Sequence, residues 1–177
     1  MNAGVPTARG GFTLIEMLVV VVAIGILAGF ALDRLLPLIG RAERVAFMRI
    51  QAQLQNQLTL VTAERMVRGE SATIPALAGT NPMQHLLKPP ENYLGEFAGM
   101  PDEPPSGHWY FDTLTATLVY LVGSHTRFDG LDGPDDRALL QVRLAFTDMN
   151  DNGSYEASRD RFDGIWLAPV YAYQWPD

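Results

Sequence analysis

The sequence predicts an α+β fold, in which one long N-terminal helix packs on a small antiparallel β-sheet. Three observations predict it: an uninterrupted apolar run, then apolar residues at helical spacing, then alternating apolar and aromatic residues near the C-terminus. A chain of 177 residues leaves room for one small domain beyond such a helix. The expected segments are a leader at 1–11, a membrane-spanning half-helix at 12–32, an amphipathic half-helix at 33–68, a proline-rich connection at 69–107 and a β-sheet head at 108–177.

The apolar run extends from Phe12 to Leu32, 21 consecutive residues with a single charge, Glu16. That length suits a helix crossing a hydrocarbon core of about 30 Å at about 1.5 Å per residue. A carboxylate one turn inside the run costs roughly 2.5–3.5 kcal/mol on insertion scales, so it needs a compensating partner. Taken alone, the run also fits a plain anchor or a long secretory signal, and Glu16 also fits a residue that reaches toward the interface.

The order of residues around this run is specific: Arg9, then Gly10 and Gly11, then Phe12, then Glu16 four positions later. This order resembles the class III signal of type IV pilins and of the pseudopilins of type II secretion systems. The resemblance implies that a prepilin peptidase cuts between Gly11 and Phe12 and methylates the new amino terminus of Phe12. It also implies three kinds of partner: other pilin or pseudopilin subunits, the prepilin peptidase and an inner-membrane assembly platform.

Glu16 has a physical role within this resemblance. Cleavage after Gly11 leaves a cationic amine on Phe12, which can meet the Glu16 carboxylate of a neighbouring subunit in a helical bundle. Such a pair is stronger at low effective dielectric than in water, and removing one partner leaves an isolated charge. The pair would also set the axial register between subunits.

The charges around the span conflict with the expected orientation. Arg9 precedes the span and four arginines follow it closely, so the positive-inside rule places the C-terminal domain in the cytoplasm. The resemblance implies the reverse: a single-pass inner-membrane protein with a cytoplasmic N-terminus and a periplasmic C-terminal domain, found in a filament after assembly. We follow the resemblance, because the peptidase of that signal acts on the cytoplasmic side.

The amphipathic half-helix carries apolar residues at spacings of 3, 4, 4 and 3, namely Phe47, Ile50, Leu54, Leu58 and Val61. We expect this stripe to pack under the sheet and the glutamines Gln51, Gln53, Gln55 and Gln57 to fill much of the opposite surface. Pro37 and Gly40 are expected to interrupt the helix. Its end is expected near Arg68-Gly69, with a base in the last turn and glycine just after it.

The connection holds seven of the chain's 12 prolines, so we expect loop with short helical turns, one of them at 83–87. Aromatic and β-branched residues at 108–111 and 117–122 then predict a hairpin. Alternation at 140–146 predicts a strand with one buried face. A last strand over 165–173, bent at Pro169, completes an antiparallel sheet of three or four strands.

One segment has the residues of a metal site. The oxygen-bearing residues alternate as in the first half of an EF-hand loop, and the candidate Ca²⁺ ligands are Asp148, Asn150, Asn152, the carbonyl of Ser154 and Glu156. The twelfth position is Arg159 instead of a bidentate glutamate, and Asp160 comes one place late. The alternative is a polar turn whose side chains satisfy local backbone groups. The resemblance favours Ca²⁺, because major pseudopilins carry it in a C-terminal loop; no other cofactor is expected.

Charge and motifs exclude other classes of protein. From Glu70 onward there are 16 acidic and 6 basic residues, and an acidic head argues against nucleic-acid binding. The sequence has no HExxH, Walker or G-x-S-x-G motif, so no enzymatic activity is expected. We therefore predict a pilin-like structural subunit of a type II secretion pseudopilus or a type IV pilus. The alternative is a membrane-anchored periplasmic binding domain that does not polymerise.

Overall fold

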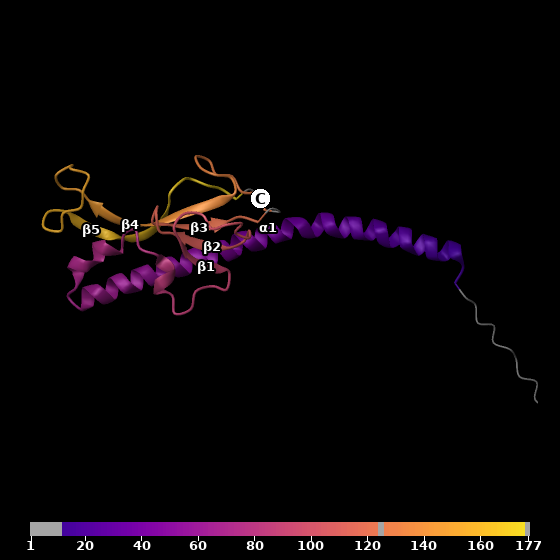
Figure 1. The fold of residues 1–177 in the computed structure, drawn as a ribbon, viewed down its shortest axis with the longest axis horizontal. Coiled ribbons are helices and arrows are strands. Elements are labelled where there is room, and N and C mark those ends of the chain that lie inside the picture. Colours follow the sequence, from indigo (N-terminus) through magenta and orange to yellow (C-terminus); the bar gives the residue numbers. More distant parts are fainter. Residues whose placement is uncertain (1–11, 124–125, 176–177) are drawn as a thin grey trace, which may run out of the picture. The chain divides into compact units, whose positions relative to one another are not determined.

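The computed structural model describes residues 12–123 and 126–175. The chain divides into two compact units, Met1–Leu38 and Ile39–Asp177. Its elements are helix α1 (Leu14–Val67), the 3₁₀ helices η1 (Ser71–Leu77) and η2 (Pro82–His85), and strands β1 (Tyr93–Phe97), β2 (Trp109–Asp112), β3 (Thr117–Leu121), β4 (Arg137–Thr147) and β5 (Arg161–Pro169) (Figure 1). The α+β class is therefore confirmed: a long N-terminal apolar helix precedes a mostly antiparallel sheet in a pilin-like arrangement.

Local signals determine both ends of α1. At its start, the Thr13 hydroxyl accepts a hydrogen bond from the backbone N–H of Glu16 at 3.3 Å, which is an N-cap contact at capping-box spacing. At its end, Gly69 has φ of 76°, and the N–H groups of Gly69 and Glu70 donate to the carbonyls of Met66 and Arg65. This is a Schellman motif, which confirms the predicted end near Gly69.

The expected interruption at Pro37 and Gly40 was wrong at the level of secondary structure, because α1 continues through both positions for 54 residues. Proline removes one backbone donor and is costly inside a helix. The segments before and after it are long and rich in helix-forming residues. Since helix propagation is cooperative, they sustain the helix across one lost bond.

The sheet has five strands in the order β1-β2-β3-β4-β5. β2 and β3 form the predicted hairpin, and β4 pairs antiparallel with both β3 and β5. β5 ends at Pro169, so the predicted continuation to residue 173 was wrong; proline offers no N–H to extend the ladder. Beyond it, the Val170 N–H donates to the Leu139 carbonyl at 2.8 Å, and an isolated bridge joins Gln174 to Asp129.

Strand β1 lies in the segment expected to be connecting loop, and it pairs in parallel with β2. The sheet therefore has one strand more than the largest predicted number and is not wholly antiparallel. Gly95, in the middle of β1, has φ of 111°, and the register shifts between Tyr93 and Glu96. A short, bulged strand with a central glycine carries no alternation that the sequence could reveal. The helical turn expected at 83–87 is the nearby η2.

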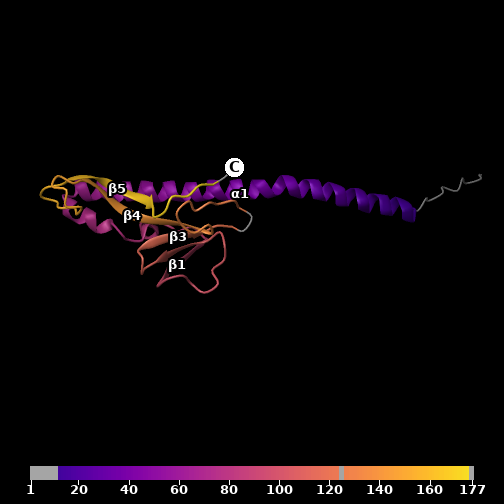
Figure 2. The ribbon, with the colours of Figure 1, turned by 90° about the horizontal axis from the view of Figure 1, so that it is seen from above.

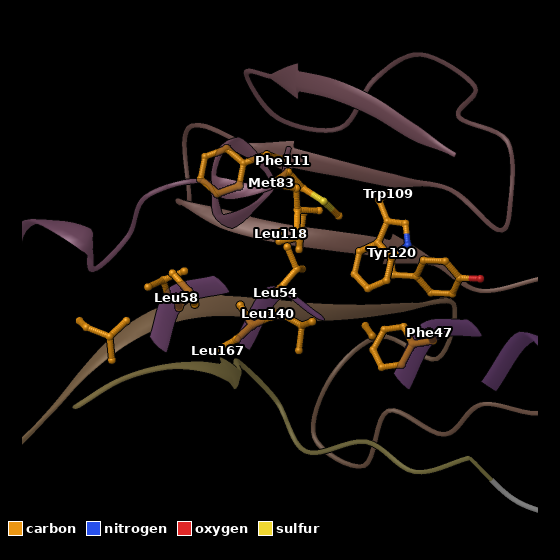
Figure 3. Close-up of a cluster of buried hydrophobic side chains, with 14 of the residues drawn as sticks. Phe47, Leu54, Leu58, Met83, Trp109, Phe111, Leu118, Tyr120, Leu140 and Leu167 are labelled. Carbon is orange, nitrogen blue, oxygen red and sulfur yellow. The ribbon is translucent and has the colours of Figure 1, made fainter. Parts of the chain in front are cut away.

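The helical stripe packs as predicted. Phe47, Leu54 and Leu58 are fully buried, and Ile50 and Val61 are partly buried against the same cluster. The C-terminal half of α1 thus lies against one face of the sheet (Figures 1 and 2). Figure 3 shows the helix residues facing side chains from the sheet: Trp109, Phe111, Leu118, Tyr120, Leu140 and Leu167.

The glutamines do not all lie on the opposite surface. The Gln55 amide donates to the carbonyl of Ile165 at 3.1 Å and accepts from the N–H of Leu167 at 2.8 Å. The side-chain amide of Gln55 therefore bonds the edge strand β5 as a neighbouring strand would. It satisfies the Ile165 carbonyl and the Leu167 N–H, which would otherwise lack partners.

No disulfide is available to hold the C-terminal segment, since the chain has no cysteine. Aromatic side chains hold it instead. Tyr173 and Trp175 lie with ring centroids 5.8 and 5.2 Å from that of Phe47, and both also contact Phe128. Arg44 adds a hydrogen bond to the Trp175 carbonyl at 3.4 Å.

Candidate assembly site

The candidate assembly site lies at the start of α1. Gly11, the expected cleavage residue, lies outside the described residues. Phe12 directly precedes the Thr13 cap and is 74% exposed, and Glu16 is exposed in the first helical turn. Within residues 12–123 and 126–175, the Glu16 carboxylate has no hydrogen-bond or ion-pair partner, whereas its backbone N–H donates to the Thr13 hydroxyl.

Electrostatics give Glu16 two possible roles. A carboxylate in the first turn interacts favourably with the positive end of the helix dipole. Glu16 also stands three residues after the N-cap Thr13, the position of the glutamate in a capping box. The sequence analysis missed this spacing, although Thr13-x-x-Glu16 is visible in the sequence. A helix-capping role therefore has to be separated from a role in assembly.

The segment Leu14–Leu32, 19 residues long, is apolar enough to cross a membrane by length and composition. None of it is buried within the chain. A helix that is apolar on all sides and has no intramolecular partners needs lipid or other helices around it. This single N-terminal helix is consistent with membrane anchoring.

Residues 7–32 match the family model described as the prokaryotic N-terminal methylation motif. The match includes Gly11, Phe12 and Glu16, and it identifies this segment as the class III signal of type IV pilins and pseudopilins. Searches among curated proteins and among solved structures gave no significant match. The N-terminal segment of this chain is therefore similar to that of type IV pilin-like and pseudopilin precursors.

The candidate Ca²⁺ loop is a closed polar turn. The Asp148 carboxylate accepts from the Gly153 N–H at 2.7 Å, Asn152 accepts from the Ser154 N–H at 2.7 Å, and the Asn150 amide donates to Glu156 at 2.8 Å. The backbone hydrogen bond from Gly153 holds the pKa of Asp148 below its ordinary value. These contacts are typical of a polar turn whose side chains satisfy local backbone groups, which was the alternative to a Ca²⁺ site.

Asp160 follows the twelfth position of the expected EF-hand loop, and its hydrogen bonds hold the two ends of this loop together. Its carboxylate is buried and accepts from the N–H groups of Met149 and Glu156 at 3.0 and 2.7 Å. Among the described residues, no three or more acidic, histidine or cysteine side chains are arranged to hold a metal ion. The ligand types fit Ca²⁺, but the carboxylates do not converge.

A second important carboxylate, Glu43, was missed by the sequence analysis. It accepts hydrogen bonds from the Tyr120 hydroxyl at 2.8 Å and the Gly123 N–H at 2.7 Å, and also from the Thr126 hydroxyl. Burial, followed by the bond to Glu43, raises the pKa of Tyr120. A Cβ on Gly123 would lie 2.7 Å from a Glu43 oxygen, so a larger residue there would displace the Glu43 carboxylate. Glu43 therefore ties α1 to the segment after β3.

Proposed function

We propose that this chain is a pilin-like structural subunit, cut by prepilin peptidase after Gly11 and assembled through its N-terminal helix into a type II secretion pseudopilus or a type IV pilus. The observation that carries the proposal is the methylation motif at residues 7–32, whose part Leu14–Leu32 forms an exposed apolar helix. In this proposal the subunit has no enzymatic activity of its own, and its work is mechanical.

Assembly follows from the charges at the start of α1. Cleavage leaves a cationic amine on Phe12, next to the positive end of the helix dipole, where a cation is unfavourable. The Glu16 carboxylate is exposed and has no partner among the described residues, so in this proposal it is available to the amine of a neighbouring subunit. Because both charges leave water as the helices pack, their pairing favours one axial register over its alternatives.

The proposed placement is in the inner membrane, with a cytoplasmic N-terminus and a periplasmic C-terminal domain. The partners are other pilin or pseudopilin subunits, the prepilin peptidase and the assembly platform, and no nucleic acid. The acidic balance after Glu70 supports the exclusion of nucleic acid, because such binding requires a basic surface.

Processing is tested by the intact mass and the N-terminal peptide of the full chain, isolated from membranes with and without prepilin peptidase. The expected result is a mature chain that starts at N-methylated Phe12 and is seen only with the peptidase. Gly11→Leu should block cleavage, whereas the matched control Gly10→Ala should not. A chain that keeps its leader, or is cut elsewhere, would favour the anchored binding domain that does not polymerise, for which Glu16 and the glycines are dispensable.

We also propose that the loop from Asp148 to Glu156 binds Ca²⁺ weakly, after its internal hydrogen bonds rearrange. The alternating oxygen ligands support the proposal, and the absence of a bidentate glutamate at the twelfth position limits the affinity. Calorimetric titration of the full chain in detergent is expected to give a dissociation constant of about 10⁻⁴–10⁻³ M. Asp148→Ala should abolish binding, and Asp132→Ala, in the other acidic loop, should not. No binding at about 10 mM Ca²⁺, a concentration above that range, would contradict the proposal.

A further inference from the structure

An open groove of about 670 Å³ lies between α1 and the segment 86–92. Ala42, Val45, Ala46 and Ile50 line its apolar part, and Val45 is 65% exposed. The volume falls within the range of about 300–1,000 Å³ typical of binding pockets. An exposed apolar surface of this kind is a candidate for contact with another molecule.

Three cations surround the apolar floor: Arg41 and Arg49 from α1, and Lys88 from the facing segment. All three are exposed, and in the part of the chain that the structure describes none of them takes part in an ion pair. The groove therefore suits an occupant that combines an apolar side chain with neighbouring carboxylates.

The same chain presents such an occupant between β3 and β4. The Gly133 N–H donates to the Gly130 carbonyl at 3.0 Å, which closes a β-turn with Leu131 and Asp132 as its two central residues. Leu131 is 53% exposed, and Asp132 and Asp135 are exposed beside it. An apolar side chain at the tip of an acidic turn thus complements an apolar groove with a basic rim.

The turn is also closely packed. A Cβ on Gly130 would lie 2.2 Å from the Pro134 carbonyl oxygen, and a Cβ on Gly133 would lie 2.8 Å from the side chain of Tyr171. Asp135 accepts a hydrogen bond from the Gly130 N–H at 3.1 Å. A turn that is closed by hydrogen bonds loses less conformational entropy on binding than an open loop does.

We infer that the groove is an interaction surface for a second copy of this chain, and that it receives the 129–136 loop of that copy. Leu131 enters the apolar floor, and Asp132 and Asp135 meet the cations of the rim. The inference rests on the proposed function, because exposed ion pairs are weak and the contact needs copies that are already concentrated by their helices.

Cysteine pairing tests the contact in the full chain, in membranes that contain prepilin peptidase. The chain has no native cysteine, so any disulfide comes from the introduced residues. Two differently tagged variants, Val45→Cys and Leu131→Cys, are co-expressed and oxidised. A disulfide-linked heterodimer is expected, at least 10-fold above that of Val45→Cys with Leu114→Cys, a control whose leucine is 74% exposed in the turn between β2 and β3. Equal yields in the two pairs would overturn the inference.

Charge reversal tests the chemistry of the rim. Arg49→Glu, added to the Val45→Cys chain, is expected to lower the heterodimer yield several-fold. Asp132→Lys, added to the Leu131→Cys chain, is expected to restore part of it. A yield that neither change affects would overturn the inference, as would a Val45→Cys chain that is captured by a different protein instead of by its second copy.

Sedimentation of sheared filaments from the same cells separates this inference from the proposed function. Filaments without the heterodimer would overturn the groove contact alone. If neither filaments nor heterodimer form, the proposed function fails together with the inference.

Discussion

Replacing Glu16 by glutamine is expected to leave membrane insertion and α1 unchanged and to abolish filament assembly. Glutamine has nearly the same size and can occupy the same capping-box position after Thr13, so the start of the helix keeps its local contacts. It lacks the negative charge, and the Phe12 amine of a neighbouring subunit then has no partner. Removing one member of a buried ion pair costs about 3–5 kcal/mol.

That loss corresponds to a decrease of roughly 10²–10⁴-fold in the association constant for each added subunit. Filaments sheared from cells should therefore fall below detection, while the full-length and processed chains remain in the membrane fraction. Cleavage at Gly11 should continue, which distinguishes failed assembly from failed processing.

Thr13→Ala is the matched control, because it removes the cap and keeps the Glu16 charge. An N-cap substitution of this kind costs about 1 kcal/mol, so assembly should be reduced but still detectable. If Glu16→Gln assembles normally while Thr13→Ala impairs assembly, Glu16 acts as a helix cap and the ion pair is excluded.

Periodic patterns in the sequence were reliable guides to the fold. The stripe from Phe47 to Leu58 was predicted from its spacing alone, because burial of one helical face imposes that period. The hairpin of β2 and β3 was predicted from aromatic and β-branched residues on either side of a short polar stretch. Strand β4 was predicted from the alternation of its buried and exposed residues. The N-terminal methylation motif at residues 7–32 was equally visible, because its order of residues is local.

Features that depend on distant partners were not predicted. Gln55 reads as a surface residue, yet it bonds β5 at Ile165 and Leu167, 110 and 112 positions later. Glu43 is likewise bound by groups from β3 and the segment after it, and no local pattern marks either contact. Strand β1 pairs in parallel with β2, and a parallel pair needs a long connection between its strands. Short-range turn signals therefore cannot indicate this pairing.

Phe47→Ala is expected to cause a large loss of stability in the unit Ile39–Asp177. Phe47 stacks on Trp109 with ring centroids 5.2 Å apart and planes within 9°, and it also contacts Tyr120, Tyr173 and Trp175. A buried phenylalanine replaced by alanine typically costs about 3–5 kcal/mol, a large part of the roughly 5–15 kcal/mol that stabilises a domain. At about 2–4 °C per kcal/mol for a chain of this size, the melting temperature should fall by roughly 6–20 °C.

The loss should be greatest at the C-terminus, because the same ring supports the segment that has no disulfide. Thermal unfolding of the full chain in detergent measures the stability, and limited proteolysis measures the release of Tyr173 and Trp175. Met48→Ala, at an exposed neighbouring position of α1, should change the free energy of unfolding by no more than about 0.5 kcal/mol. If the two variants unfold at the same temperature, or if the C-terminal segment of Phe47→Ala stays protected, the aromatic cluster is not what holds that segment in place of a covalent link.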